Sequence, residues 1–122
     1  MKIAIVDDDP DLMEVMYLAL NEAGHEVTTS PSGATVIPEL KNNPPDVLIT
    51  DLMMSEVSGL ELCEMVRGSI RLSDMKVIFI SARTDPLWKQ KARDCGATGF
   101  IDKPFDPIHF AANVEQIVAK GS

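Results

Sequence analysis

Five polar side chains that could take part in chemistry each stand at the end of an apolar run. They are Asp7 and Asp8 after IAIV, Asp51 after VLIT, Ser81 after VIFI and Lys103 after GFID. Carboxylates held close together raise one another's pKa, and a bound cation removes that repulsion. Oxygen ligands with some retained water suit Mg²⁺, which often bridges to a phosphate. If these residues meet, they predict a magnesium site where Asp51 is the nucleophile and a hydroxyl and an ammonium stabilise a phosphoryl group.

The pattern of apolar residues indicates which elements must bring these side chains together. Short apolar runs bounded by turn residues predict strands near residues 2–7, 25–29, 47–50, 76–81 and 99–102. The segments between them have helical spacing, as in the stripe of Leu12, Val15, Met16 and Ala19. Alternating strands and helices predict an α/β fold, a flavodoxin-like doubly wound parallel sheet of five strands with five helices. In the strand order 2-1-3-4-5, the reactive residues converge at the carboxyl edge of the sheet.

Local signals set the ends of three helices. Asp9 is a suitable N-cap for a first helix that has Pro10 at its first position. Pro38 falls inside GATVIPELK, so we expect the second helix to be short, late-starting or bent. Gly96 is placed to end the helix that precedes the fifth strand.

Length and composition limit the class of protein. The 122 residues show no break in composition, which predicts one domain over residues 1–122. A formal net charge of −8 disfavours direct contact with nucleic acid or a membrane surface. Without a membrane-spanning run or a signal peptide, we expect a cytoplasmic protein. Cys63 and Cys95 match no metal-ligand spacing and are interpreted as free core residues in a reducing compartment.

The motifs also occur in an order that is typical of a known family. The stretches VDDDP, DVLITDLMM with Gly59 eight residues after Asp51, VIFISA, GATGF and KPF follow one another along the chain. Together they resemble the receiver domain of response regulators in two-component signal transduction, over essentially all 122 positions. The resemblance implies that Asp51 accepts a phosphoryl group from the phosphohistidine of a histidine kinase or a histidine phosphotransfer protein, with Mg²⁺ as cofactor.

The resemblance assigns roles to single residues around Asp51. It implies that Asp8 and Asp51 hold Mg²⁺ directly together with the backbone carbonyl of Met53, and that Asp7 acts through water. It also implies that Ser81 and Lys103 contact the phosphoryl group.

Further implied features concern switching. Ser81 and Phe100 would form the switch, which changes the surface of the fourth helix, fifth strand and fifth helix. The bond between Lys103 and Pro104 is expected to be cis. Ser55 stands where many members of the family have proline, and we expect the loop there to be more mobile.

The resemblance also implies how the protein acts in a pathway. It would be a phosphoprotein of a two-component system or phosphorelay, with an unidentified downstream effector, as a monomer or a weak phosphorylation-dependent dimer. It would not be an enzyme beyond catalysing its own phosphorylation and slow dephosphorylation. Slow loss of phosphate is expected because Met53 and Arg83 carry no acid or amide that could orient water.

Three alternative functions are weighed against this one. A phosphohydrolase of the haloacid dehalogenase type needs a second acid two residues after the nucleophile, where this chain has Met53. A flavodoxin-like cofactor carrier needs a Ser-, Thr- and Gly-rich first loop, and this loop is acidic. A pseudo-receiver that only docks is disfavoured because all of the reactive positions are present.

Overall fold

In the part of the chain that the structure describes, five parallel strands form one sheet in the order β2-β1-β3-β4-β5, as predicted. The computed structural model describes residues 1–54, 57–83 and 85–121. The strands are β1 (Lys2–Val6), β2 (Glu26–Ser30), β3 (Val47–Asp51), β4 (Lys76–Ser81) and β5 (Gly99–Asp102). The winding reverses between β1 and β3, so loops that follow these two strands flank a crevice at the carboxyl edge.

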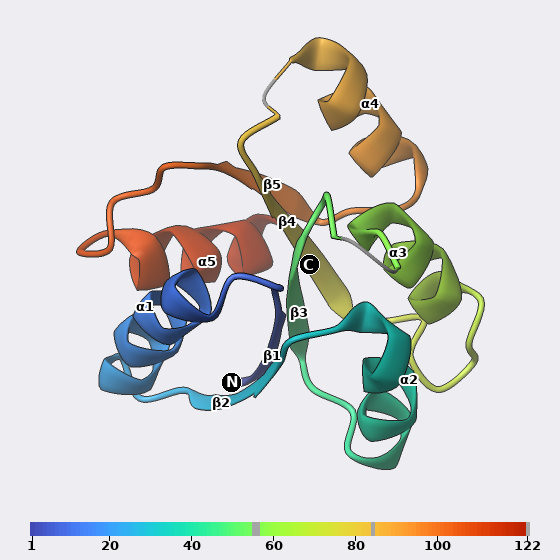
Figure 1. Cartoon of the computed structure of the whole chain (residues 1–122). Helices are drawn as coiled ribbons and strands as arrows, with labels where there is room; N and C mark the ends of the chain where they lie inside the picture. The colour runs from blue at the N-terminus through green and yellow to red at the C-terminus, as the bar shows by residue number, and fades with distance from the viewer. Residues whose placement is uncertain (55–56, 84, 122) are drawn as a thin grey trace.

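Within the described residues, five helices cover the two faces of this sheet. They are α1 (Pro10–Glu22), α2 (Gly33–Asn42), α3 (Gly59–Arg67), α4 (Pro86–Asp94) and α5 (Phe110–Lys120). Figure 1 shows α1 and α5 together on one face and α2, α3 and α4 on the other. No helix in the described part of the chain is long and apolar enough to cross a membrane.

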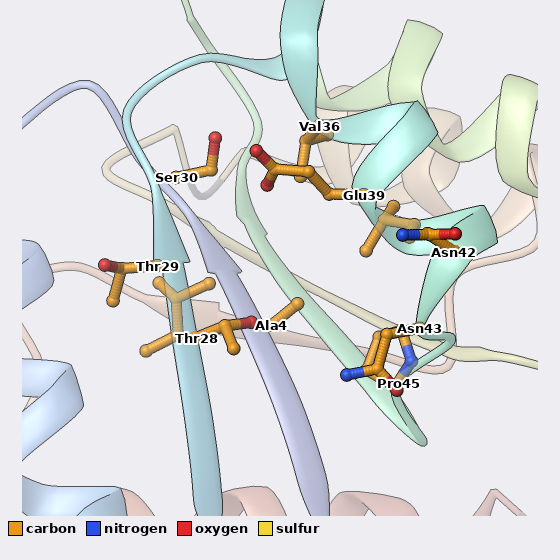
Figure 2. A pocket seen from close by; sticks show the side chains of 11 residues that line it. Ala4, Thr28, Thr29, Ser30, Val36, Glu39, Asn42, Asn43 and Pro45 are labelled. Atoms are coloured by element: carbon orange, nitrogen blue, oxygen red, sulfur yellow. The ribbon is translucent and has the colours of Figure 1, made fainter.

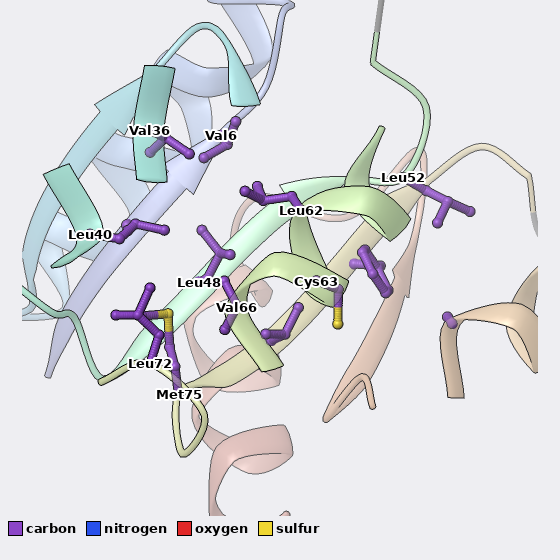
Figure 3. Close-up of a cluster of buried hydrophobic side chains, with 14 residues drawn as sticks. Val6, Val36, Leu40, Leu48, Leu52, Leu62, Cys63, Val66, Leu72 and Met75 are labelled. Carbon is purple, nitrogen blue, oxygen red and sulfur yellow. The ribbon is translucent and has the colours of Figure 1, made fainter. Parts of the chain in front are cut away.

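Each face of the sheet packs against its helices through a separate hydrophobic cluster. Ile5 and Ile49 pack with Met16 and Phe110 beneath α1 and α5. The residues before Ile5 and Ile49 on the same strands, Ala4 and Leu48, point the other way. They join the cluster beneath α2, α3 and α4, whose members are shown in Figure 3: Ala4, Val6, Val36, Leu40, Leu48, Leu52, Leu62, Cys63, Val66, Leu72, Met75, Val77, Phe79 and Ala92. Burial on both faces explains why β1, β3 and β4 read as nearly continuous apolar runs.

The helix signals in the sequence are partly confirmed. The Asp9 side chain accepts hydrogen bonds from the N–H groups of Asp11 and Leu12, and Pro10 is the first residue of α1. Gly96 follows α4 with a φ of +95°, a left-handed conformation that favours glycine.

Of the three alternatives expected for α2, short, late-starting or bent, the late start is wrong. The helix begins at Gly33, capped by the Ser32 hydroxyl, and runs through Pro38. Val36 and Leu40 are buried on either side of Pro38, which is exposed. Packing of the apolar face against the core therefore holds the helix together where one backbone hydrogen bond is missing.

Candidate functional site

Three carboxylates meet at the carboxyl ends of β1 and β3. Val6 pairs with Thr50 in the sheet, so Asp7 and Asp51 follow this pair side by side. One oxygen from each of Asp7, Asp8 and Asp51 lies within 4.8 Å of the others, which is close enough to hold one metal ion. Asp7 and Asp51 are buried and Asp8 is exposed, so an ion here would remain open to water on one side.

Asp7 has an unusual environment for a carboxylate. Oδ1 accepts a hydrogen bond of 2.9 Å from the N–H of Asp9, but Oδ2 is buried and accepts no hydrogen bond, with only the Lys103 ammonium nearby at 3.5 Å. Burial is the main reason why the pKa of Asp7 is raised, although the Asp9 N–H and the charge of Lys103 act in the opposite direction. A buried oxygen that accepts no hydrogen bond carries a large desolvation cost. A hydrated cation would satisfy this oxygen through a water molecule.

Lys103 supplies the positive charge of the cluster. Its Nζ donates a hydrogen bond of 2.9 Å to Oδ2 of Asp51 and lies 3.5 Å from Oδ2 of Asp7. Burial alone would lower the pKa of Lys103, but the contacts with the two carboxylates outweigh it and the pKa is raised. The peptide bond between Lys103 and Pro104 is cis, as expected.

The loop after β3 folds back on Asp51. The N–H of Met53 donates a hydrogen bond of 3.0 Å to Oδ1 of Asp51, which forms a tight Asx-type turn. The Met53 backbone therefore lies beside the acidic cluster, while its side chain is exposed. Ser55, where we expect greater mobility, lies outside the described residues.

The position of Gly59, eight residues after Asp51, has a structural reason. Its N–H donates a hydrogen bond of 3.0 Å to the carbonyl of Leu52. A Cβ at this position would overlap the backbone carbonyl of Asp51. Glycine at the start of α3 therefore allows this helix to pack directly behind the acidic cluster.

Ser81 and Phe100 occupy the neighbouring strand ends. Ser81 ends β4, is 2% exposed, and accepts a hydrogen bond of 2.9 Å from the N–H of Arg83 through Oγ. The N–H of Lys103 donates to the carbonyl of Ser81, so the two residues are linked through the backbone. Phe100 on β5 is partly buried against the cluster beneath α2, α3 and α4.

A contact between α4 and β5 was not found by sequence reasoning. Lys89 Nζ lies 3.4 Å from Oδ1 of Asp102 and 5.6 Å from the centre of the Phe100 ring. The spacing of Lys89 and Asp102 in the chain gives no local signal for this pair. It links the position of α4 to the residue expected to act as the switch.

One surface hollow adjoins the acidic cluster, and another lies away from it. An apolar hollow of about 400 Å³ adjoins the acidic cluster through Lys103; its lining is Leu12, Val15, Ala82, Lys103, Pro104, Phe105 and Pro107. A second cavity, of about 260 Å³, lies between β2 and α2, with Thr28 and Glu39 among the residues on its walls (Figure 2). None of the predicted site residues lines the second cavity.

The donor set of the cluster is suited to a hard divalent cation. All of the candidate ligands are oxygens, and three of them are carboxylates. Mg²⁺ prefers such ligands and keeps several of its waters, which matches the exposed side of the site at Asp8. The buried Oδ2 of Asp7 adds a second, independent reason for a cation here.

Comparison with known proteins gives a consistent result. The sequence model of the response regulator receiver domain matches residues 3–115. The transcriptional regulatory protein KdpE of Mycobacterium tuberculosis (strain CDC 1551 / Oshkosh) is 32% identical over 120 residues, which are 98% of this chain and 52% of KdpE. BaeR of Escherichia coli O6:H1 is 30% identical over 119 residues, covering 98% of this chain and 48% of BaeR. The chain thus spans about half the length of the curated relatives it matches.

Solved structures with the same fold include both chemotaxis proteins and other regulators. The chemotaxis response regulator CheY4 of Vibrio cholerae superposes with a TM-score of 0.89 at 28% identity, covering 95% of this chain and 97% of CheY4. A response regulator described as putative, from Chloroflexus aurantiacus, gives a TM-score of 0.90 at 31% identity and covers 97% of each chain.

Proposed function

The chain belongs to the family of response regulator receiver domains, and from this premise we propose that Asp51 accepts a phosphoryl group from a phosphohistidine donor. The observation that carries the proposal is the position of the Asp51 carboxylate. Its Oδ2 accepts a hydrogen bond from the ammonium of Lys103, and the same carboxylate belongs with Asp7 and Asp8 to the acidic cluster that could hold a metal ion. A nucleophile in this position has a cation site on one side and a fixed positive charge on the other.

The site residues divide the chemistry among them. Asp8, Asp51 and the backbone carbonyl of Met53 would hold Mg²⁺, and Asp7 would act through water. When bound, Mg²⁺ neutralises charge that builds up on the phosphoryl oxygens. An Asp51 carboxylate oxygen attacks phosphorus while the P–N bond to the donor histidine breaks, which yields an acyl phosphate and a free imidazole. Lys103 and Ser81 then contact the phosphoryl oxygens.

Phosphorylation would then change the population of two surface conformations. In the structure, the Ser81 Oγ accepts a hydrogen bond from the N–H of Arg83, which leaves its O–H able to donate to a phosphoryl oxygen once the hydroxyl moves toward the phosphoryl group. Its movement would let Phe100 reorient and would disturb the contact between Phe100 and Lys89. A nearly complete swing requires a difference of about 5.5 kcal/mol between the two states. The surface of α4, β5 and α5 would present this change to an effector.

The partners follow from the same site. We propose a histidine kinase or a histidine phosphotransfer protein as the donor. The apolar hollow beside Lys103 could receive an apolar side chain of such a protein next to Asp51. The named relatives are transcriptional regulators about twice as long, so the effector could lie in the same polypeptide or in a separate protein. We further propose a cytoplasmic location and a monomer or a weak phosphorylation-dependent dimer.

We expect the acyl phosphate to persist. Hydrolysis in line with the Asp51–phosphate bond is aided by a side chain that orients water. Met53, whose side chain is exposed beside Asp51, offers only a thioether, and Arg83 offers a cation. Position 53 also lacks the second acid that a haloacid dehalogenase-type phosphohydrolase requires, so nothing in the site favours that alternative.

The central experiment uses acetyl phosphate as a small donor. The protein is incubated with acetyl phosphate and Mg²⁺, weighed by intact mass spectrometry, and followed through the fluorescence of Trp88, the single tryptophan. We expect the mass of one phosphoryl group to appear in the wild type and to be absent in Asp51→Asn and in EDTA. Asp46→Asn, on the loop before β3, is the matched control and should react like the wild type. An unmodified wild-type protein would overturn the proposal.

A further inference from the structure

The two cysteines of the chain lie at the contact between α3 and the end of α4. The thiol of Cys63 on α3 donates a hydrogen bond of 3.2 Å to the backbone carbonyl of Cys95, the residue that caps α4. The Cys95 thiol donates a hydrogen bond of 3.2 Å to the carbonyl of Ala92, and each of the two thiols affects the pKa of the other. Both are free in the structure. Figure 3 shows Cys63 within the buried cluster, whereas Cys95 is partly exposed.

A second contact from α3 fixes the same segment. Arg67 lies one turn after Cys63, on the same side of the helix. Its Nε and Nη2 donate hydrogen bonds of 3.1 and 2.7 Å to the carbonyl of Gly96. Cys63 and Arg67 therefore hold two consecutive carbonyls, those of Cys95 and Gly96. This arrangement keeps Cys95 against α3 before any bond is made, which lowers the entropic cost of joining the two sulfurs.

We propose that Cys63 and Cys95 are a modification site, at which a low-molecular-weight disulfide such as oxidised glutathione converts the two thiols into a reversible disulfide between α3 and α4. The formation of this bond is independent of the proposed phosphorylation. Its consequence for signalling rests on the proposed function, because α4 is part of the surface that would change on phosphorylation. A covalent link at the end of α4 restricts the movement of that helix.

The exposure of the two thiols sets the order of the steps. The thiolate of Cys95 attacks one sulfur of the small disulfide, forming a mixed disulfide and releasing one small thiolate. The buried Cys63 then loses its proton to water, and its thiolate attacks Sγ of Cys95, releasing the second small thiolate. The protein loses two hydrogen atoms and two electrons, and the small disulfide is reduced to two thiols.

The same burial makes the reaction slow at neutral pH. Burial raises the pKa of Cys95, and it raises the pKa of Cys63 to about 12, with the neighbouring Cys95 thiol adding to this effect. Because the thiolate is the nucleophile, oxidation should accelerate as the pH rises from 7 to 9. Sustained oxidising conditions, instead of brief exposure, would be needed to form the bond.

The test is a thiol count on the intact protein. Wild-type protein is incubated with oxidised glutathione at pH 8.5, quenched with an excess of iodoacetamide in denaturing urea so that the buried Cys63 thiol is also accessible, and weighed. We expect a species that carries no alkyl group and no glutathione, has lost two hydrogen atoms, and takes up two alkyl groups after dithiothreitol. Two alkylated thiols, a lasting glutathione adduct, or a disulfide between two chains would each overturn the proposal.

Variants test the formation of the disulfide separately from its effect on the movement of α4. Cys63→Ser should stop at a stable glutathione adduct on Cys95, and Cys95→Ala should gain no adduct. Asp51→Asn should form the disulfide like the wild type, so failure of phosphorylation and failure of oxidation can be told apart. In the oxidised wild type, we expect acetyl phosphate to change the Trp88 fluorescence at most half as much as in the reduced protein. An equal change would overturn the claim that the bond restrains α4.

Discussion

Lys103 and Asp51 are joined by a hydrogen bond of 2.9 Å from Nζ to Oδ2, although 52 residues separate them in the chain. Their strands, β5 and β3, are not neighbours, because β4 lies between them. The ammonium therefore reaches across the carboxyl end of β4 and ties two sides of the crevice together. Before phosphorylation this contact neutralises part of the acidic cluster, and an incoming phosphoryl group would compete for the same ammonium.

Replacement of the Lys103 ammonium should change metal binding and phosphorylation in opposite directions. In Lys103→Met, a transferring phosphoryl group loses a positively charged donor, so we expect reaction with acetyl phosphate to slow about a hundredfold. Mg²⁺ should bind more tightly, because a competing positive charge has left the carboxylates. Stopped-flow fluorescence of Trp88 measures the rate, and a Mg²⁺ titration measures the affinity. A reaction rate equal to that of the wild type would contradict the proposed role of Lys103.

Asp7 should make the metal-free protein less stable as the pH rises. Because burial raises its pKa, the folded state binds more protons than the unfolded state between the ordinary value of 3.8 and the raised one. The free energy of unfolding therefore falls as the pH rises through this interval and stays lower above it. In EDTA at pH 7, we expect Asp7→Asn to raise the free energy of unfolding by about 1 kcal/mol relative to the wild type.

Urea unfolding from pH 4 to 8 provides the measurement. Asp9→Asn is the matched control, because it makes the same change of charge and asparagine caps a helix about as well as aspartate. This control should follow the wild-type dependence on pH, whereas Asp7→Asn should show a weaker one. The additional stability gained from Mg²⁺ should be smaller in Asp7→Asn. Parallel pH curves for Asp7→Asn and the wild type would show that Asp7 does not destabilise the metal-free state.

The sheet was predictable because each central strand is marked by its own residues. β1, β3 and β4 are apolar on both faces and end in a polar residue, which fixes both their position and the edge where the site lies. Errors are confined to the ends of elements: β1 stops before Asp7, β2 begins after His25 and extends to Ser30, and β3 includes Asp51. Hydrogen bonding to a neighbouring strand decides such boundaries, and it leaves little trace in the local sequence.

Contacts between distant side chains were not predictable in the same way. The meeting of Lys103 with the acids was expected as a consequence of strand order, but its hydrogen bond to Asp51 before phosphorylation was not. The contacts of Lys89 with Asp102 and Phe100 depend on how α4 packs against β5. Trp88 illustrates the same limit, since Arg83 and Lys91 both lie over its ring, at 5.3 and 4.6 Å. Side-chain packing, which no pattern of spacing encodes, determines these pairs.

The lifetime of the phosphoryl group should depend on position 53. The Met53 side chain is exposed beside Asp51, so a polar group there would have access to the attacking water. We expect Met53→Asn to hydrolyse its phosphate about tenfold faster than the wild type, because an amide can hold water in line with the bond to be broken. The decay of the phosphorylated mass after removal of acetyl phosphate gives the rate. Met53→Leu, which adds no hydrogen-bonding group, should decay like the wild type; equal decay of all three proteins would exclude control from this position.

The apolar hollow beside Lys103 should affect the rate of phosphoryl transfer from a protein donor, but not from a small-molecule donor. Val15 on α1 is 37% exposed and lines this hollow together with Leu12 and Pro104. A carboxylate on the wall of this hollow would have to lose water when an apolar partner side chain enters. We therefore expect Val15→Asp to react with acetyl phosphate like the wild type, but to accept phosphate at least about tenfold more slowly from a histidine kinase that phosphorylates the wild type.

Leu87→Asp, on the exposed side of α4, is the control and should be phosphorylated normally by both donors. Normal transfer from the kinase to Val15→Asp would place the donor on another face of the protein, and slow reaction with acetyl phosphate would show that the substitution had damaged the site itself.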